Sequence, residues 1–126
     1  VPNDCRELAA VTAREHGNVH RSESLDAAAI VRLLDRCDAW RRPERFAQLL
    51  QACECDARGR LGLEDRAYPQ RVRLGAALQA ALGVDTSQVA ERAAAMSLSG
   101  PQIGERIRLA RVQAIDAWLS AQPPSR

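Results

Sequence analysis

Residues 25–40, LDAAAIVRLLDRCDAW, decide the fold class of this sequence. Their apolar members recur at spacings of three and four residues, which places them on one face of a helix. Arg32 and Asp35 fall outside that face. The apolar face consists of Leu25, Ala28 or Ala29, Val31 or Leu33, and Leu34. The stretch therefore predicts an amphipathic helix that packs against other helices.

Proline and glycine divide the rest of the chain into further helices. Proline fits the first position of a helix and glycine fits its end. The prolines in this role are Pro43, Pro69 and Pro101, and the glycines are Gly17, Gly59 and Gly83. Helices are expected over residues 3–16, 25–40, 43–58, 69–82, 85–96 and 101–122. Because no alternating β-branched run or hairpin signal occurs, the predicted fold is all-α with about six helices.

Residues 59–68, GRLGLEDRAY, interrupt this helical pattern. They contain two glycines and mixed charges without a helical period, which is typical of a surface loop. A chain of 126 residues can form one core or two small ones. The loop is therefore the expected boundary between residues 1–58 and residues 59–126.

The composition, 46% hydrophobic and 27% charged, is that of a folded globular protein. The sequence has no apolar run long enough for a membrane span and no signal peptide, so a cytoplasmic protein without membrane contact is expected. Val1 is not Met, which suggests a chain cut from a longer polypeptide. All 18 basic residues are Arg, yet the net charge is only +2, so binding to nucleic acid would need a local patch.

Most catalytic motifs are missing from the sequence. It has no Gly-rich phosphate loop, no Gly-x-Ser-x-Gly and no paired Asp-x-Asp of a nucleotidyl-transfer centre. The four cysteines, Cys5, Cys37, Cys53 and Cys55, lack the spacing of a zinc site and are interpreted as structural thiols. A complete polymerase centre is therefore not expected in these 126 residues.

His16, His20 and Asp56 are the candidates for binding a divalent metal. A spacing of four would place both imidazoles on one face of a helix, but the Gly17-Asn18 pair is expected to interrupt that helix. In the alternative interpretation, His16 interacts with carbonyl groups of its own helix, His20 is a solvated loop residue, and Asp56 forms an ion pair at a helix end.

Five arginines on the last two long helical stretches are candidates for contacts with nucleic-acid phosphates. They are Arg71, Arg73, Arg106, Arg108 and Arg111. The alternative is that these charges only solvate exposed helix faces.

Four blocks of the sequence together resemble a known family. They are CRELAAVTAREHGNVH (5–20), DAWRRPERFAQLLQACECDARGR (38–60), YPQ (68–70) and GPQIGERIRLARVQAIDAW (100–118). In order and spacing they are similar to the C-terminal region of bacterial CCA-adding tRNA nucleotidyltransferases that carry an HD phosphohydrolase domain. The resemblance spans nearly the whole chain.

The resemblance implies an enzyme that adds C, C and A to tRNA 3′ ends from CTP and ATP, with Mg²⁺ bound in an upstream head. It also implies 2′,3′-cyclic phosphodiesterase, 2′-nucleotidase and phosphatase activities of an HD domain, whose adjacent His-Asp pair lies upstream and which uses a divalent transition metal such as Ni²⁺. Residues 1–58 would then end the HD domain, and residues 59–126 would form a helical arm that supports tRNA. The upstream head and HD domain would be partners in the same chain.

By this resemblance, His16 and Asp56 are the expected metal ligands, with His20 a weaker candidate. The five arginines become candidates for contact with tRNA. Gly17 departs from the family pattern because an acidic residue can stand there in relatives.

Two other hypotheses remain open at this point. A stand-alone helical module could bind a protein partner or form a homodimer through Trp40 and Trp118, but each Trp follows an apolar helical face, which favours a place in the core. A self-sufficient HD hydrolase is disfavoured, because two histidines and one aspartate without the His-Asp pair cannot build the site.

Overall fold

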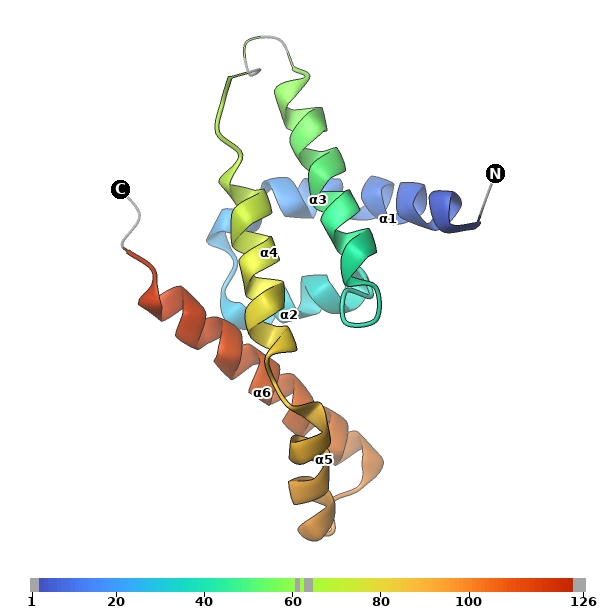
Figure 1. Ribbon diagram of the computed structural model, residues 1–126, viewed down its shortest axis with the longest axis vertical. Helices are drawn as coiled ribbons and strands as arrows, with labels where there is room; N and C mark the ends of the chain where they lie inside the picture. The colour runs from blue at the N-terminus through green and yellow to red at the C-terminus, as the bar shows by residue number, and fades with distance from the viewer. Residues whose placement is uncertain (1–2, 61, 63–64, 124–126) are drawn as a thin grey trace.

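The computed structural model describes residues 3–60, 62 and 65–123, and every regular element in these residues is helical (Figure 1). The elements are α1 (Asn3–His20), the 3₁₀ turn η1 (Ser22–Ser24), α2 (Ala27–Arg36), α3 (Pro43–Arg58), α4 (Pro69–Leu82), α5 (Thr86–Ala95) and α6 (Gly100–Ala121). The predicted all-α class and its six α-helices are confirmed. None of the helices in the described part is long and apolar enough to cross a bilayer.

Side chains that bind free backbone N–H groups fix the starts of three helices. The Asp26 carboxylate accepts a hydrogen bond from the Ala29 amide at 2.8 Å, which begins α2. The Asp85 carboxylate accepts a hydrogen bond from the Gln88 amide, which begins α5. Ser99 and Gln102 form a reciprocal capping box at the start of α6. The predicted ends at Gly59 and Gly83 are also confirmed, since these residues follow the last turns of α3 and α4.

The prediction that Gly17 ends the first helix is wrong. α1 continues to His20, and the Arg21 amide still donates to the Gly17 carbonyl at 3.2 Å. A glycine inside a helix costs only about 1 kcal/mol, and full burial of Val19 in the last turn offsets such a cost. His16 and His20 are therefore on the same helix, one turn apart.

The helix predicted over residues 25–40 is shorter than expected, since α2 ends at Arg36. Asp38 has a φ of 54°, in the left-handed region that ends many helices. The Arg41 guanidinium binds the Asp38 carboxylate at 2.8 Å and stabilises this turn. The predicted loop over residues 59–68 has no helix at residues 59, 60, 62 and 65–68, and residues 61, 63 and 64 lie outside the described ones.

One hydrophobic cluster joins helices from both sides of that loop. α2 supplies five buried residues, and it packs mainly against α6 and also against α4. The fully buried large side chains of this cluster include Ile30, Leu33, Leu34, Phe46, Leu49, Leu74 and Ile115. The hairpin of α5 and the first half of α6 extends away from the rest of the molecule (Figure 1). The division of the chain at residues 58 and 59 stays a prediction.

All four cysteines are free. Cys37 and Cys53 are buried in the hydrophobic cluster, whereas Cys5 and Cys55 are exposed. The interpretation as structural thiols therefore fits Cys37 and Cys53, whereas Cys5 and Cys55 are free thiols on the surface.

Candidate functional site

The end of α1, the last turn of α3 and the start of α4 meet at one corner of the molecule. His20 is the last residue of α1, Asp56 lies in the last turn of α3, and Tyr68 directly precedes α4. Pro69 restricts the backbone at the start of α4, which fixes the direction in which Tyr68 leaves the loop. Three segments that are distant in sequence thus bring polar side chains together.

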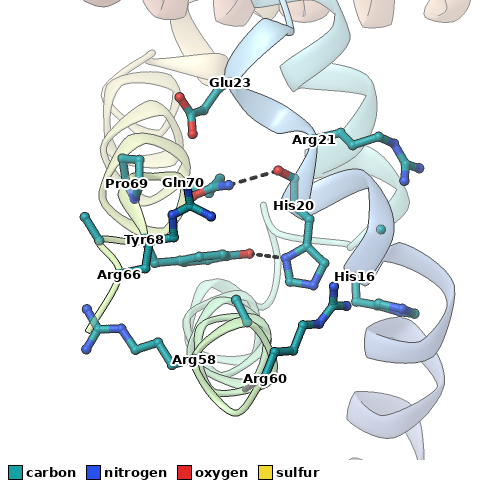
Figure 2. Close-up of a pocket in the computed structure, with 13 residues that line it drawn as sticks. His16, His20, Arg21, Glu23, Arg58, Arg60, Arg66, Tyr68, Pro69 and Gln70 are labelled. Carbon is teal, nitrogen blue, oxygen red and sulfur yellow. Dashed lines mark hydrogen bonds between the residues drawn. The ribbon is translucent and has the colours of Figure 1, made fainter. Parts of the chain in front are cut away.

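The His20 ring binds two of these side chains. Its Nε2 lies 3.0 Å from the Asp56 Oδ2, and its Nδ1 lies 2.7 Å from the Tyr68 hydroxyl, a contact shown in Figure 2. An ionised carboxylate only accepts hydrogen bonds, so Nε2–H donates to Asp56. In the neutral ring, Nδ1 then accepts a hydrogen bond from the Tyr68 hydroxyl. The carbonyl of His20 also accepts a hydrogen bond from the Gln70 amide at 2.9 Å.

This arrangement sets the charge states of its two acids. The hydrogen bond from His20 is the main cause that lowers the pKa of Asp56, and the nearby Arg60 lowers it further. Burial raises the pKa of the Tyr68 hydroxyl. At neutral pH the corner therefore contains an aspartate anion and an un-ionised tyrosine on opposite sides of one imidazole.

His16 lies next to His20, with 5.9 Å between the ring centroids and an angle of 81° between the ring planes. Its Nδ1 donates to the carbonyl groups of Thr12 and Ala13, at 3.1 and 3.0 Å. These contacts match the alternative in which His16 interacts with its own helix. Figure 2 shows the His16 ring directed away from the ring of His20.

The donor atoms of the corner suit a divalent metal in kind but are too few to hold one alone. Imidazole nitrogen and carboxylate oxygen are the usual ligands of such metals, and His20 and Asp56 present one of each 3.0 Å apart. The described residues contain no group of three or more His, Cys, Asp or Glu residues that could hold a metal ion. The pair fits one part of a metal site.

A pocket of about 630 Å³ opens beside this corner (Figure 2). His16 and His20 line one wall, and Tyr68 and Gln70 line another. The charged residues in the lining are Arg21, Arg58, Arg60, Arg66 and one carboxylate, Glu23. The lining side chains therefore carry a net positive charge, although Arg58 and Arg60 each also bind a carboxylate of α3.

The predicted arginines of α4 both have partners within the chain. Arg71 binds the Glu54 carboxylate of α3 at 2.6 Å. Arg73 donates to the Leu25 carbonyl at 2.9 Å, and its Nε is buried without a hydrogen-bond partner. Arg73 thus joins α4 to the segment before α2.

The three predicted arginines of α6 differ from one another. Arg108 binds Glu105 at 2.5 Å on the helix surface. Arg111 lies over the Trp40 ring, 4.2 Å from its centroid, and joins α6 to the turn after α2. Arg106 is exposed and lines a groove of about 480 Å³ between α5 and α6. The structure does not gather the five candidate arginines in one pocket.

Tyr68, Gln70 and Arg66 were not among the candidates identified from sequence motifs. Tyr68 is the only tyrosine in the chain and is 8% exposed, although it follows a polar loop. A single aromatic residue directly before a helix-starting proline is the signal that could have identified it.

The chain is similar to curated proteins over almost its whole length. It is 64% identical to the multifunctional CCA protein of Paracidovorax citrulli over 99% of the chain and 30% of that relative. It is 63% identical to that of an Acidovorax species and 61% identical to that of Verminephrobacter eiseniae, over 98% and 97% of the chain and 29% and 30% of those relatives.

The chain thus spans about 30% of the length of the curated relatives that it matches. No family model matches the chain, and no solved structure matches it. The resemblance inferred from the four sequence blocks is confirmed by identities above 60%. The chain belongs to the family of multifunctional CCA proteins, as their C-terminal region.

Proposed function

We propose that this chain is the helical C-terminal part of an enzyme that adds C, C and A to tRNA 3′ ends and that also hydrolyses phosphate esters. The name multifunctional CCA protein, shared by relatives with identities above 60%, supports the first activity. Nucleotidyl transfer from CTP and ATP with Mg²⁺ belongs to a head outside these 126 residues. Residues 1–58 end the phosphohydrolase domain, and residues 59–126 support the tRNA.

The observation that carries the phosphohydrolase part is the 3.0 Å contact between His20 Nε2 and Asp56 Oδ2. Both atoms are suitable metal ligands, and the upstream domain would supply the others, including an adjacent His-Asp pair. The geometry favours His20 over His16 as a ligand, because the His16 ring is directed away from that of His20 (Figure 2). His16 stays a candidate through its Nε2, since its Nδ1 donates to backbone carbonyl groups.

Tyr68 would orient His20 in either state of the site. If Nε2 were a metal ligand, the ring proton would lie on Nδ1, and Nδ1–H would donate a hydrogen bond to the Tyr68 hydroxyl. Without a ligand at Nε2, the hydroxyl donates to Nδ1. A divalent transition metal such as Ni²⁺ in this site would supply an activated water and stabilise charge on the phosphate.

Arg106 and Arg108 are the best candidates for contact with the tRNA backbone. Both lie on α6, and neither makes a contact like those by which Arg73 and Arg111 join α4 and α6 to the segments that flank α2. Phosphate contacts of this kind position an RNA without reading its sequence. Replacing Arg73 or Arg111 would test packing as much as RNA binding.

The experiment uses the intact protein that contains this chain. Purified protein is incubated with tRNA lacking CCA, CTP, ATP and Mg²⁺, and separately with a 2′,3′-cyclic nucleotide and Ni²⁺. The proposal predicts CCA addition in the first assay and hydrolysis in the second. Absence of CCA addition would refute the nucleotidyltransferase assignment, and absence of hydrolysis would refute the phosphohydrolase assignment.

The tRNA contact has its own measurement. Alanine at Arg106 and Arg108 should weaken tRNA binding and reduce its salt dependence, by a slope of about 1 for each phosphate that an arginine no longer neutralises. Arg32→Ala, an exposed change on α2, is the matched control. Equal affinity and an equal salt slope for the double variant would remove this part of the proposal.

A further inference from the structure

We propose that Arg60 and Arg66 form a binding site for a phosphate group in the pocket beside His20. The proposal deepens the function proposed above and rests on it for the identity of the substrate, because it assigns recognition of the substrate's phosphate to two residues of this chain. Phosphate binding itself can be measured without catalysis.

The charge of the pocket lining is the first argument. Four arginines and one carboxylate, Glu23, line this pocket of about 630 Å³. Guanidinium groups bind phosphate oxygens with paired, charge-assisted hydrogen bonds. The pocket therefore suits an anion, and it is large enough for a phosphate group together with the nucleoside to which that phosphate is bonded.

The position of Arg60 is the second argument. Its guanidinium lies 3.5 Å from the Asp56 Oδ2 that also binds His20. Figure 2 shows Arg60 reaching to the side of His20, whereas the Arg21 guanidinium donates to the Asn18 side chain of α1 at 3.2 Å. A phosphate bound by Arg60 would thus lie next to the imidazole and carboxylate of the proposed metal site.

The helix ends around the pocket have opposite effects on the binding of an anion. α4 begins at the pocket, and the preceding residue Tyr68 provides no side-chain cap, so the positive end of this 14-residue helix faces the same region. The C-terminal ends of α1 and α3 contribute partial negative charge there. Arg58 and Arg60 lie at the end of α3 but are each paired with a carboxylate of that helix, and Arg66 adds a cation from the segment before α4.

Arg66 differs from its neighbours in its partners. Arg58 is bound to Glu54 at 3.2 Å, and Arg60 shares Asp56 with His20. The Arg66 side chain makes no ion pair or hydrogen bond with another described residue, and the residue is exposed in the lining of the pocket. Binding a phosphate would therefore not require Arg66 to give up another carboxylate.

The test measures binding of inorganic phosphate to the intact protein in EDTA, by titration calorimetry or by ³¹P line broadening. We expect saturable binding that the Arg60→Ala and Arg66→Ala double variant weakens about tenfold or more, as for the loss of charge-assisted hydrogen bonds. Arg60→Lys should restore part of the affinity, because it restores charge but not the paired donors. Arg32→Ala, away from the pocket, should bind like the wild type.

Competition identifies the source of the phosphate. A free 2′,3′-cyclic nucleotide and a tRNA that ends in a 2′,3′-cyclic phosphate should each displace inorganic phosphate, and the stronger competitor is the preferred source. In the hydrolysis assay, the double variant should show a higher KM with a smaller change in kcat.

No phosphate binding by the wild type, or equal binding by the wild type and the double variant, would overturn the proposal. Either result could occur while the intact protein still hydrolyses cyclic phosphates, which would leave the proposed function standing. Conversely, phosphate binding that depends on both arginines, in a protein without hydrolase activity, would support this site and refute only the phosphohydrolase assignment. Far-UV circular dichroism of each variant checks that these exposed changes leave the fold intact.

Discussion

His20 and Asp56 lie 36 positions apart in the sequence, yet the Nε2 of one is 3.0 Å from the Oδ2 of the other. This contact joins the end of α1 to the last turn of α3. The Tyr68 hydroxyl, 2.7 Å from His20 Nδ1, joins the same ring to the start of α4. The contact therefore has two roles. It holds α1 against α3, and its two atoms are the proposed metal ligands.

The first prediction concerns the pKa of Asp56. The hydrogen bond from His20 is the main cause that lowers it, so His20→Ala should raise the pKa toward the ordinary value of an aspartate. The stability that this contact contributes is present above the ordinary pKa and is lost as the pH falls through the lowered one. An NMR titration of the Asp56 carboxyl carbon measures the change.

His16→Ala is the control for that titration. His16 is the weakest of the groups that lower the pKa of Asp56, so its removal should shift the midpoint much less. An unchanged midpoint in His20→Ala would show that the hydrogen bond does not act as described.

Glu15 gives a second prediction about pH. The residue is 2% exposed and accepts hydrogen bonds from Arg14, Asn18 and the Arg36 of α2. Burial opposes its ionised form, yet these hydrogen bonds outweigh burial and lower its pKa. Glu15→Gln should cost about 1–3 kcal/mol of unfolding free energy at pH 7.

The cost should depend on pH in a defined direction. A lowered pKa stabilises the folded chain above the ordinary glutamate value, about 4.3, and that contribution is lost as the pH falls through the lowered pKa. Urea unfolding between pH 3 and pH 7 should therefore show the two proteins converging toward low pH. A difference that stays constant would contradict the assignment, and the exposed Glu91→Gln should have little effect throughout.

Ile115 provides a test of how α6 is held. It is the one residue among the described part of α6 that is buried in the core, with 0% exposure, while most of the helix is partly or fully exposed. Ile115→Ala should cost about 2–5 kcal/mol in urea unfolding, because it leaves a cavity where α6 meets the core. Leu109→Ala, at a residue 41% exposed, is the matched control and should cost much less. Equal costs would indicate that α6 is held elsewhere.

The helix ends of this protein could be predicted from local residues, because proline, glycine and short polar caps act on the adjacent backbone. Pro43, Pro69 and Gly83 are at the predicted positions. Gly17 could not be interpreted in this way, because its place inside α1 depends on tertiary burial of the following turn. Ile30 was likewise missing from the predicted apolar face, although it is fully buried.

The candidate site was only partly predictable. His16, His20 and Asp56 could be singled out by residue type, but the contact between His20 and Asp56 depends on how α1 packs against α3. Tyr68 and Arg66 come from an irregular segment without periodicity, so no sequence pattern placed them at the corner. The metal-binding role of His16, His20 and Asp56 and the RNA-binding role of the arginines on α4 and α6 stay predictions.

The rates at which the four cysteine thiols are alkylated test which of them are buried in the core. Burial raises the pKa of Cys37 to about 12 and that of Cys53 to about 11. Since the thiolate is the reactive form, iodoacetamide at pH 8 should label the exposed Cys5 and Cys55 first. Mass spectrometry of digested samples gives the order, and all four should react alike in denaturant. Rapid labelling of Cys37 in the folded chain would contradict the packing around α2.

The corner formed by His20 and Asp56 is proposed to serve the phosphohydrolase and not the nucleotidyl-transfer head. The most direct measurement compares both activities in the intact wild-type protein and in its His20→Ala and Asp56→Asn variants. Hydrolysis of a 2′,3′-cyclic nucleotide should fall by at least about 10- to 100-fold, the loss typical when even an outer-shell partner of a metal ligand is removed, while CCA addition to tRNA stays unchanged. Unchanged hydrolysis in both variants, or an equal loss of both activities, would contradict it.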